Sequence, residues 1–519
     1  ELFTANLRTA QATDYYTLNG FGTEIWHPSF IYHGFRYVEI SGYPGTPTLD
    51  DFEGHVVYDN IPLSGSFTSS DTLLNQLYKN AFWSINSNYK GMPVDCPQRN
   101  ERQPWLGDRT TGAYGESFLF DNSRLYAKWL DDIMYAQKED GCIPDVAPAF
   151  FRYYSDNMTW AGTYLTVAEM LYNQYGDLRS IEKHYPHMKK WLNYMEDRYL
   201  EDGIMTKDTY GDWCDPPRTI EDGRGKSADV KEPSQLISTA YYYHYLDLME
   251  EFAILTNNVN DIAQYRASRK QVVESFNRTF MADDGTHYEP NTLTNNLLAY
   301  AFELVPEENA EKVLEHIRES IEDYDGHLST GIVGVQWLMR TLSRNGLEDL
   351  AYSIVTKTTY PSWGYMIENG ATTIWELWNG NTAAPSMNSQ NHVMMLGDLL
   401  VWYYEDLAGI KSHPESPAFR KILMKPTFPD GLKYVNASYE SVQGKITSNW
   451  NMRTDSLYWE IIIPANTTAE IHLPAQDVKE IWENGAPVTR AKGIHSCRES
   501  GNEVVIEAGS GHYHFTAKH

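Results

Sequence analysis

Cysteine and long apolar runs are both scarce in this chain. Its four cysteines among 519 residues are too few for a disulfide scaffold and lack the spacing of a metal site; they are Cys96, Cys142, Cys214 and Cys497. No stretch of eighteen or more apolar residues occurs, so we expect no membrane span. The remaining composition, 42% hydrophobic and 22% charged residues, is that of an ordinary globular protein.

Positive charge is also in short supply. The chain has 42 Lys and Arg residues against 70 Asp and Glu residues, which gives a formal net charge of −28. Such a surface repels a polyanion, and no basic stripe is visible, so we exclude nucleic acid as a partner. A neutral substrate suits this charge more easily than a strongly acidic one, although local charge can override the average.

The length predicts two or three domains, because 519 residues are too many for one hydrophobic core. Residues 1–66 contain alternating stretches at 35–40 and 55–58 between Gly and Pro turns, which indicates strands. We expect this region to be the incomplete C-terminal part of a β-sandwich, followed by a linker. The first residue is Glu1 and no signal peptide precedes it, so we expect a processed or trimmed piece.

Residues 67–411 have the apolar periodicity of helices. Segments with this spacing lie at 73–85, 125–133, 160–175, 185–195, 234–256, 260–280, 309–323, 331–343 and 390–408. Roughly a dozen helices in all suit an (α/α)6 barrel, in which two rings of six helices carry a substrate cup of long loops. An irregular helical array is the alternative that periodicity leaves open.

Residues 412–519 return to short alternating segments joined by turns such as Asn484-Gly485. They predict a C-terminal antiparallel β-sandwich. The predicted fold class is therefore multidomain and mainly α, with an (α/α)6 barrel catalytic domain flanked by β-sandwich segments.

Two segments concentrate carboxylates among aromatic residues. The first, kept irregular by prolines and a glycine, contains Asp95, Arg99, Glu101, Trp105 and Asp108. A solvated surface loop is the plain reading, but a backbone pinned by proline between helices favours a preorganised site.

The second segment holds Glu376 between Trp375 and Trp378, downstream of Trp363. Indoles remove water from a carboxylate, and this desolvation raises a carboxyl pKa and suits acid/base work. Glu376 could equally pair with an arginine while the tryptophans pack in the core, and the sequence leaves both readings open.

Further candidate substrate-binding residues lie elsewhere on predicted loops and helix starts: Trp160, Asp212, Trp213 and His392. Indole faces stack on sugar rings, and carboxylates bind sugar hydroxyls, so 15 Trp and 37 Tyr point to carbohydrate even though many must be core. The motifs of serine hydrolases, phosphate-binding loops and zinc proteases are absent. His512 and His514 share a strand face without an evident third ligand, so we expect no metal and no cofactor.

At this point a family resemblance adds to the argument. Asp95-Cys-Pro-Gln-Arg99, with Glu101, Trp105 and Asp108, resembles a signature of the α-L-rhamnosidases of glycoside hydrolase family 78. So does Gly370-Ala-Thr-Thr-Ile-Trp-Glu376, followed by Met387-Asn-Ser and Asn391-His392. The resemblance covers nearly the whole chain. It implies an (α/α)6 barrel between β-sandwiches and an inverting hydrolysis of terminal α-L-rhamnosyl residues from glycans or glycosides.

The resemblance also implies residue roles. Glu101 matches the general acid and Glu376 the general base. Matches to sugar-binding or supporting polar positions are Asp95, Arg99, Asp108 and His392; matches to the aromatic walls are Trp105, Trp160, Trp213 and Trp363. In the implied mechanism one carboxyl protonates the leaving oxygen and the other activates water, with the two groups about 6.5–9.5 Å apart.

Several positions depart from the family pattern. This chain has Gln103-Pro104 where the family usually has other residues, and Asn100 where an acidic residue is common. Its Trp160-Ala-Gly162 resembles a family segment that often is Trp-Gly-Asp. These changes leave the two glutamates in place and put the identity of the bound sugar in question. An inverting exo-glycosidase for another sugar and a non-catalytic carbohydrate-binding protein are therefore the alternatives. A glycan-degrading function implies an extracytoplasmic place, periplasmic or secreted, and the oligomeric state stays open.

Overall fold

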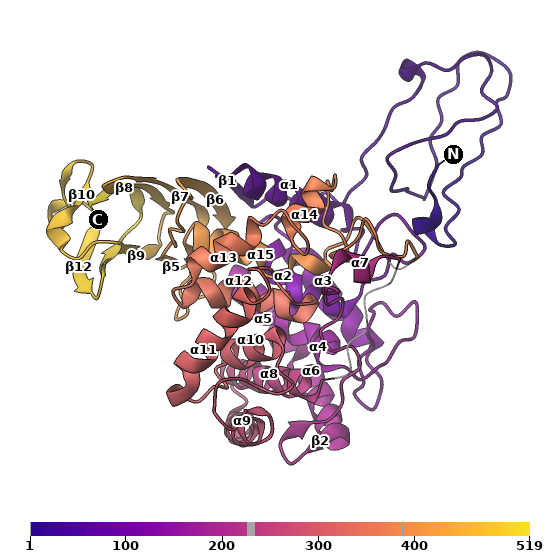
Figure 1. Cartoon of the computed structure of the whole chain (residues 1–519). Helices are drawn as coiled ribbons and strands as arrows, with labels where there is room; N and C mark the ends of the chain where they lie inside the picture. The colour runs from indigo at the N-terminus through magenta and orange to yellow at the C-terminus, as the bar shows by residue number, and fades with distance from the viewer. Residues whose placement is uncertain (1, 226–233, 387, 519) are drawn as a thin grey trace.

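Helices fill the middle of the chain, and strands gather at its C-terminal end (Figure 1). The computed structural model describes residues 2–225, 234–386 and 388–518. Among these residues no helix is both long and apolar enough to cross a membrane. Met387, which belongs to the second motif, lies outside the described residues.

Two kinds of helix alternate along the described part of residues 72–407. Inner helices are buried over most of their surface; they are α2 (Leu106–Glu116), α5 (Thr163–Tyr175), α8 (Gln235–Leu255), α10 (Leu293–Ala301), α12 (Ile332–Arg344) and α15 (Leu399–Val401), which continues as a π-helix at Trp402–Leu407. Outer helices bury one face; they are α1 (Thr72–Ser87), α3 (Ser123–Ala136), α6 (Leu178–Tyr199), α9 (Val259–Phe280), α11 (Glu307–Glu322) and α13 (Glu348–Val355).

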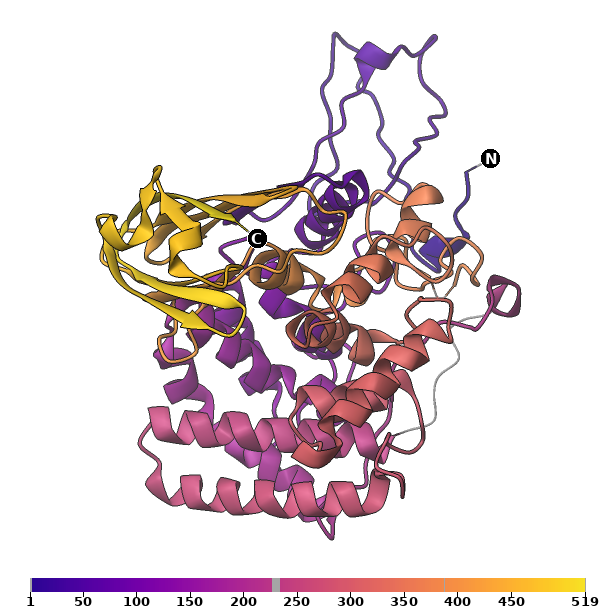
Figure 2. The ribbon, with the colours of Figure 1, turned by 60° about the vertical axis from the view of Figure 1, so that its left-hand side comes forward.

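The neighbouring helices α8 and α9 show the difference. Helix α8 buries 15 of its 21 residues, whereas α9 buries five of 22. The two lie antiparallel at one side of the helical domain (Figure 2). Ser234 begins α8 by accepting a hydrogen bond from the backbone N–H of Ile237, which satisfies one of the free donors of the first turn.

The connections between these helices differ in length in a regular way. Those that follow an inner helix are short, at 117–122, 176–177, 256–258, 302–306 and 345–347. Those that precede an inner helix are long, and they contain the short helices α4 (Met158–Ala161), α7 (Ile220–Gly223) and α14 (Trp363–Glu368). Because successive helices of a hairpin ring run in opposite directions, the long connections meet at one mouth, beside the N-termini of the inner helices.

The expected helix at 390–408 is wrong as a single element. A 3-10 turn at Met394–Leu396 precedes α15 and the π-helix. Gly397 separates them with a φ of 49°, and a Cβ at this position would lie 2.9 Å from the backbone of Val335. A close approach to α12 therefore interrupts the helix where periodicity alone predicts continuity.

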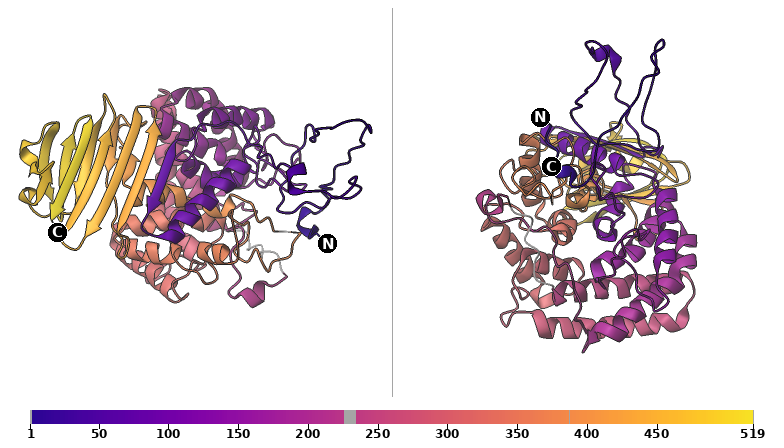
Figure 3. Two further views of the ribbon diagram at one scale, coloured as in Figure 1. Left: turned by 90° about the horizontal axis from the view of Figure 1, so that it is seen from above. Right: turned by 90° about the vertical axis from the view of Figure 1, so that its right-hand side faces the viewer.

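The strands after residue 409 form two sheets together with β1, which precedes the helices (Figure 3). The seven-stranded sheet has the order β1-β6-β7-β8-β14-β10-β11, and the five-stranded sheet has the order β12-β13-β9-β5-β4. Their bounds are β1 Gly65–Ser69, β4 Ile410–Ser412, β5 Lys421–Met424, β6 Tyr434–Ser441, β7 Gly444–Arg453, β8 Ser456–Ile463, β9 Thr468–Leu473, β10 Ile481–Glu483, β11 Ala486–Pro487, β12 Ile494–Ser500, β13 Glu503–Ala508 and β14 Gly511–Lys518. A separate hairpin joins β2 (Leu200–Glu201) to β3 (Ile204–Met205).

This C-terminal domain differs from the expected antiparallel sandwich in two ways. Strand β1 comes from before the helices and pairs with β6, and β5 pairs with β9 in parallel. The indole N–H of Trp450 donates to the carbonyl of Leu407 at 2.8 Å, which fixes the sheet to the end of the last inner helix. The expectation that His512 and His514 lack a third neighbour is also wrong, because Glu460 on β8 bonds His512 at 2.7 Å.

The N-terminal segment, residues 2–62, leaves the helical domain on the side away from the C-terminal sheets (Figures 1 and 3). Its described residues form two 3-10 turns, Ala5–Leu7 and Leu49–Asp51, and no strand. The strands expected at 35–40 and 55–58 are absent there because neither stretch has a backbone hydrogen-bond ladder with another strand. The interpretation of this segment as part of a β-sandwich stays a prediction.

The structure explains the departure at Gly162. A Cβ at this position would overlap the phenol ring of Tyr245 on α8, so no larger side chain fits here while Tyr245 stays. Gly112 in α2 is also buried, but its nearest neighbour, Glu116 Oε1, lies 3.9 Å from such a Cβ.

We predict that Gly162→Ala lowers the free energy of unfolding by about 1–3 kcal/mol, because overpacking forces Tyr245 to move. Gly112→Ala is the matched control and should be neutral or slightly stabilising, because alanine favours the helix. Thermal unfolding of the two variants beside the unaltered protein measures this difference. Equal melting temperatures for all three would contradict the prediction.

Candidate functional site

Arg99 is the centre of the candidate site. It lies in the long connection 88–105, and its side chain is buried. One nitrogen, Nη2, contacts Glu101 Oε2 at 2.5 Å and Glu376 Oε2 at 3.1 Å. The structure thus brings together the two glutamates that the sequence singled out, although they come from connections at opposite ends of the helical domain's sequence.

Glu101 is half-buried at the mouth. Its Oε1 accepts a hydrogen bond of 3.1 Å from the indole N–H of Trp105. Burial raises the pKa of Glu101, and the charges of Asp95 and Glu376 raise it further, whereas Arg99 and Arg8 lower it. The net effect is a raised pKa, which lets this carboxyl hold a proton for transfer.

Asp95 has the opposite electrostatic environment. Its Oδ1 accepts the backbone N–H of Gln103 at 2.6 Å, and its Oδ2 faces His392 Nε2 at 3.7 Å. Burial raises the pKa of Asp95, but His392, Cys96 and Arg99 outweigh burial and hold the pKa below its ordinary value. Neighbouring carboxyls whose pKa values are pushed apart are typical of acid/base sites.

His392 is oriented by its own backbone neighbourhood. Its Nδ1 accepts the N–H of Met394 at 3.2 Å, which only a ring without a proton on Nδ1 can do. Burial lowers the pKa of His392, while Asp95, Glu376 and Asp108 raise it to about 9. Both protonation states keep the Nε2 proton toward Asp95, whereas the hydrogen bond from Met394 forms only with the neutral ring and is lost when His392 is charged.

Glu376 is held by Ser389 as well as by Arg99. The backbone N–H of Ser389 donates to Glu376 Oε2 at 2.7 Å, and the N–H of Glu376 donates to the carbonyl of Ser389 at 2.9 Å. The structure thus shows the pairing with an arginine that one reading of this motif expects, and it places Glu376 beside Glu101. The acid/base reading stays a prediction.

Asp108 lies in the first turn of α2 and is 5% exposed. Within the described residues its Oδ2 has no hydrogen-bond partner, and neither do Nε and Nη1 of Arg99. These buried atoms are free to bind hydroxyl groups of a sugar. Asp95, Cys96 and Glu101 also bring three ligand-type atoms within 4.8 Å of one another, but these groups are already engaged with each other and with Arg99.

Three of the expected aromatic residues surround this centre. Trp105 is half-buried and stacks on Tyr153 with ring centroids 5.6 Å apart. Trp160 packs against Tyr210 at 4.3 Å, and Trp213 meets the edge of the same tyrosine at 5.8 Å. Gly107 leaves room for Trp160, since a Cβ there would overlap the indole.

Three other expected substrate-binding residues have structural positions instead. Asp212 accepts the backbone N–H groups of Gly331, Val333 and Gly334, and also the hydroxyl of Thr294, so its carboxylate is fully used at the start of α12. Trp363 and Trp378 are fully buried and pack edge to face. Their indole N–H groups donate to backbone carbonyls, and we therefore assign both tryptophans to the core.

Sequence reasoning missed residues that lack a local motif. Arg8 in the N-terminal segment lies 3.1 Å from Glu101 Oε2, and its Nε donates to the carbonyl of Ser386 at 2.7 Å. Tyr210 donates to Asp145 at 2.7 Å beside the tryptophans. No spacing in the sequence connects Arg8 with Glu101, and only the fold brings them together.

Family models cover most of the chain. The bacterial alpha-L-rhamnosidase 6 hairpin glycosidase domain matches residues 62–407, the C-terminal domain of the same enzymes matches 409–486, and their concanavalin-like domain matches 1–58. The six-hairpin description agrees with the alternation of inner and outer helices, and the mainly α barrel predicted from the sequence is confirmed.

The similar proteins with a curated name carry the same family name, alpha-L-rhamnosidase. A Formosa agariphila protein named alpha-L-rhamnosidase is 33% identical over 100% of this chain and 56% of its own length. A Streptomyces avermitilis alpha-L-rhamnosidase, solved in complex with L-rhamnose, superposes with a TM-score of 0.91 at 32% identity, covering 100% of this chain and 48% of that one. The structure of the Dictyoglumus thermophilum alpha-L-rhamnosidase superposes with a TM-score of 0.87 at 36% identity, covering 94% of this chain and 54% of that one. The chain spans about half the length of the curated relatives it matches.

The environment of Asp108 predicts a pH dependence of stability. Burial raises the pKa of Asp108 from 3.8 to about 7, so the folded protein binds this proton more tightly than the unfolded chain does. The free energy of unfolding therefore falls as the pH rises above 3.8, and it stops falling on account of Asp108 above about pH 7. Asp108→Asn, which is neutral and of equal size, should stabilise the protein by about 2–4 kcal/mol at pH 8 and hardly at all at pH 4.

Thermal unfolding across this pH range tests the prediction. Asp283→Asn, at an exposed position, serves as the control and should follow the unaltered protein throughout. A stabilisation by Asp108→Asn that is the same at pH 4 and pH 8 would contradict the assignment.

Proposed function

This chain belongs to the bacterial α-L-rhamnosidase family, and on that basis we propose that it hydrolyses terminal α-L-rhamnosyl residues from glycans or glycosides. The observation that carries the proposal is the convergence of Glu101 and Glu376 on one guanidinium nitrogen of Arg99. Two carboxyls in different environments, beside buried polar atoms without partners, are what general acid/base hydrolysis of a glycoside requires.

In this proposal Glu101 is the general acid. Its raised pKa keeps a proton available. Trp105 holds Oε1, and Arg99 and Arg8 hold Oε2, so the carboxyl is oriented on both oxygens. Transfer of that proton to the leaving oxygen neutralises the charge that develops as the bond to the anomeric carbon breaks.

Glu376 is the general base. Ser389 and Arg99 fix its carboxylate, so that Glu376 takes a proton from a water molecule as that water attacks the anomeric carbon. The contacts of 2.5 and 3.1 Å with one nitrogen of Arg99 keep the nearest oxygens of the two glutamates closer together than the separation of about 6.5–9.5 Å in inverting enzymes. The two carboxyls therefore have to move apart when sugar and water enter, and the inverting course rests on the family membership. An attack from the face opposite the leaving group inverts the anomeric carbon.

The sugar would lie between the polar group and the aromatic walls. The free Oδ2 of Asp108 and the free nitrogens of Arg99 bind its hydroxyls, and Asp95 with His392 completes the polar side. Trp105, Trp160 and Trp213 supply apolar faces for the ring.

Hydrolysis of an aryl α-L-rhamnoside tests the reaction and both roles. Glu376→Gln should lower kcat by about 10²–10⁴-fold, because the substituted amide cannot accept the proton of water. Glu101→Gln should lower it less on a substrate with a good leaving group, which needs little protonation. NMR of the first sugar anomer released should show inversion. Absence of turnover by the unaltered, folded protein on this substrate would contradict the proposal.

Arg8 provides a second test, through the pH profile. Arg8 lowers the pKa of Glu101, and the general acid must be protonated to act. Arg8→Ala should therefore shift the alkaline limb of kcat/KM to higher pH, and Arg8→Lys should restore most of the original profile. An unchanged alkaline limb in Arg8→Ala would show that Arg8 does not act on Glu101.

A further inference from the structure

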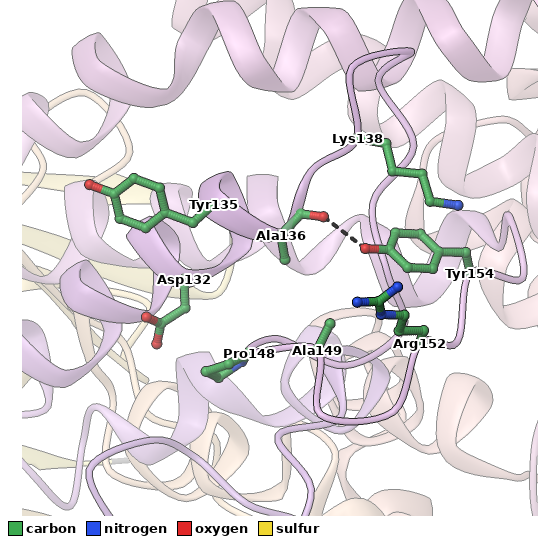
Figure 4. Close-up of a pocket in the computed structure, with 8 residues that line it drawn as sticks. All are labelled: Asp132, Tyr135, Ala136, Lys138, Pro148, Ala149, Arg152 and Tyr154. Atoms are coloured by element: carbon green, nitrogen blue, oxygen red, sulfur yellow. Dashed lines mark hydrogen bonds between the residues drawn. The ribbon is translucent and has the colours of Figure 1, made fainter.

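Clusters of titratable side chains outside the candidate site offer different surroundings to an ion. The hollow between the end of α3 and residues 148–154 carries the cations Lys138 and Arg152, and its Asp132 is already paired with Lys128 (Figure 4). These charges disfavour a positive ion. A cluster of the opposite kind lies on the seven-stranded sheet of the C-terminal domain, where two imidazoles and a carboxylate meet.

This group, which we call the β8–β14 cluster, consists of Glu460, His512 and His514. One ligand atom from each residue lies within 4.8 Å of the ligand atoms of the other two. Glu460 Oε1 is 2.7 Å from His512 Nε2, and the two imidazole rings have centroids 4.4 Å apart. Two imidazole nitrogens and one carboxylate oxygen are a donor set that Zn²⁺ takes in proteins.

The register of the sheet brings the three side chains together. In the antiparallel pair of β8 and β14, Glu460 lies directly opposite His514, and His512 is two residues away on the same strand. Because side chains alternate between the two faces of a strand, all three point to one face. The intervening Ile461 and Tyr513 are buried on the other face, so the cluster faces solvent and an ion reaches it directly.

Asn449 on β7 fixes the carboxylate of the cluster. It pairs with Glu460 across the two strands, and its Nδ2 donates to Glu460 Oε2 at 2.9 Å. This hydrogen bond leaves Oε1 directed at the histidines. Carboxylates that bind a metal are commonly held by a second polar group in this manner, which orients them before the ion arrives. Asn449 is therefore a positioning residue.

A small rearrangement is enough for the cluster to hold an ion. Zn–N bonds of about 2.0–2.1 Å in a tetrahedron place neighbouring ligand atoms about 3.3 Å apart. The ion would take the place of the proton between Glu460 and His512, whose atoms are now 2.7 Å apart. Both histidines are exposed, so their rings can turn without disturbing the core. Water would fill the fourth position.

A histidine on the other sheet has carboxylate neighbours but different charges around them. His472 on β9 lies 3.0 Å from Glu470 and 2.8 Å from Glu503. These carboxylates are paired with Lys421 at 3.6 Å and Lys425 at 3.1 Å, and the two ammonium groups oppose a metal ion. Within the described ranges, the carboxylate of the β8–β14 cluster has no lysine or arginine partner.

We propose that the β8–β14 cluster binds one Zn²⁺ ion through Glu460, His512 and His514. The open face of a sheet has no walls that exclude water, so the ion links β8 to β14 and takes no part in the hydrolysis. An ion that binds only the folded protein stabilises it. The proposal goes beyond the proposed function and does not depend on it. It replaces the expectation of no metal, which was based on the lack of an evident third ligand.

Calorimetric titration of the chelator-treated protein with ZnCl₂ tests the site. The unaltered protein should bind one ion that the variant with both His512→Gln and His514→Gln does not bind. Asn449→Ala should keep the site but raise its Kd about 10-fold to 100-fold, because the carboxylate is no longer held. His472→Gln is the matched control and should bind as the unaltered protein does.

Thermal unfolding gives a second measurement, in which each protein is compared with and without zinc. ZnCl₂ at about 100 times the Kd should raise the Tm of the unaltered protein and of His472→Gln by a few degrees, and EDTA should reverse the rise. The double variant should show no rise. CaCl₂ should leave every Tm unchanged, because Ca²⁺ prefers oxygen ligands to imidazole. Equal Tm values of the unaltered protein and the double variant without zinc show that the variant folds.

Three results would overturn the proposal: no zinc binding by the unaltered protein, equal binding by the double variant, or loss of binding in His472→Gln as well. Hydrolysis of an aryl α-L-rhamnoside by the unaltered protein should be the same with and without EDTA, and the double variant should keep that rate. A loss of rate in either case would contradict the placement of the ion outside catalysis.

Discussion

The alternation of a largely buried helix with a half-buried one is the constraint on which the site depends. Successive helices run in opposite directions, so every connection that precedes an inner helix reaches the same mouth. The structure places its long connections there and its short ones at the far end. The N-termini of the inner helices point toward this mouth, where Asp108 lies in the first turn of α2. Residues distant in sequence are thereby brought around one centre.

Within that mouth, the surroundings of each carboxyl decide its chemistry, because the residue types alone do not. Asp95 has a backbone donor and faces His392, and these neighbours outweigh its burial and lower its pKa. Burial raises the pKa of Glu101, and the neighbouring carboxylates Asp95 and Glu376 raise it further, which outweighs Arg99 and Arg8. Arg99 prevents the mutual repulsion of Glu101 and Glu376 from separating them. A single buried cation therefore makes a close pair of glutamates possible.

The helical domain and the two glutamates were predictable from the sequence, because the residues of each motif lie close together in the chain. The helical periodicity indicates the barrel, and the two carboxylate segments identify Glu101 and Glu376. The sequence does not separate Trp105, which lines the mouth, from Trp363 and Trp378, which are core, since the same indole serves either purpose. Asp212 was misread for a similar reason, because a loop carboxylate caps a helix as readily as it binds a sugar. Arg8 was missed because only tertiary structure brings it to Glu101.

The net charge of the chain says little about its candidate site, because it is an average over distances that solvent screens. At physiological salt a charge acts over about 8 Å, so a group in the mouth experiences its immediate neighbours and not the acidic surface as a whole. Around Glu101 those neighbours are the cations Arg99 and Arg8 and the carboxylates Asp95 and Glu376. The arrangement of these few charges, more than the sum of −28 over the chain, therefore sets the pKa of Glu101.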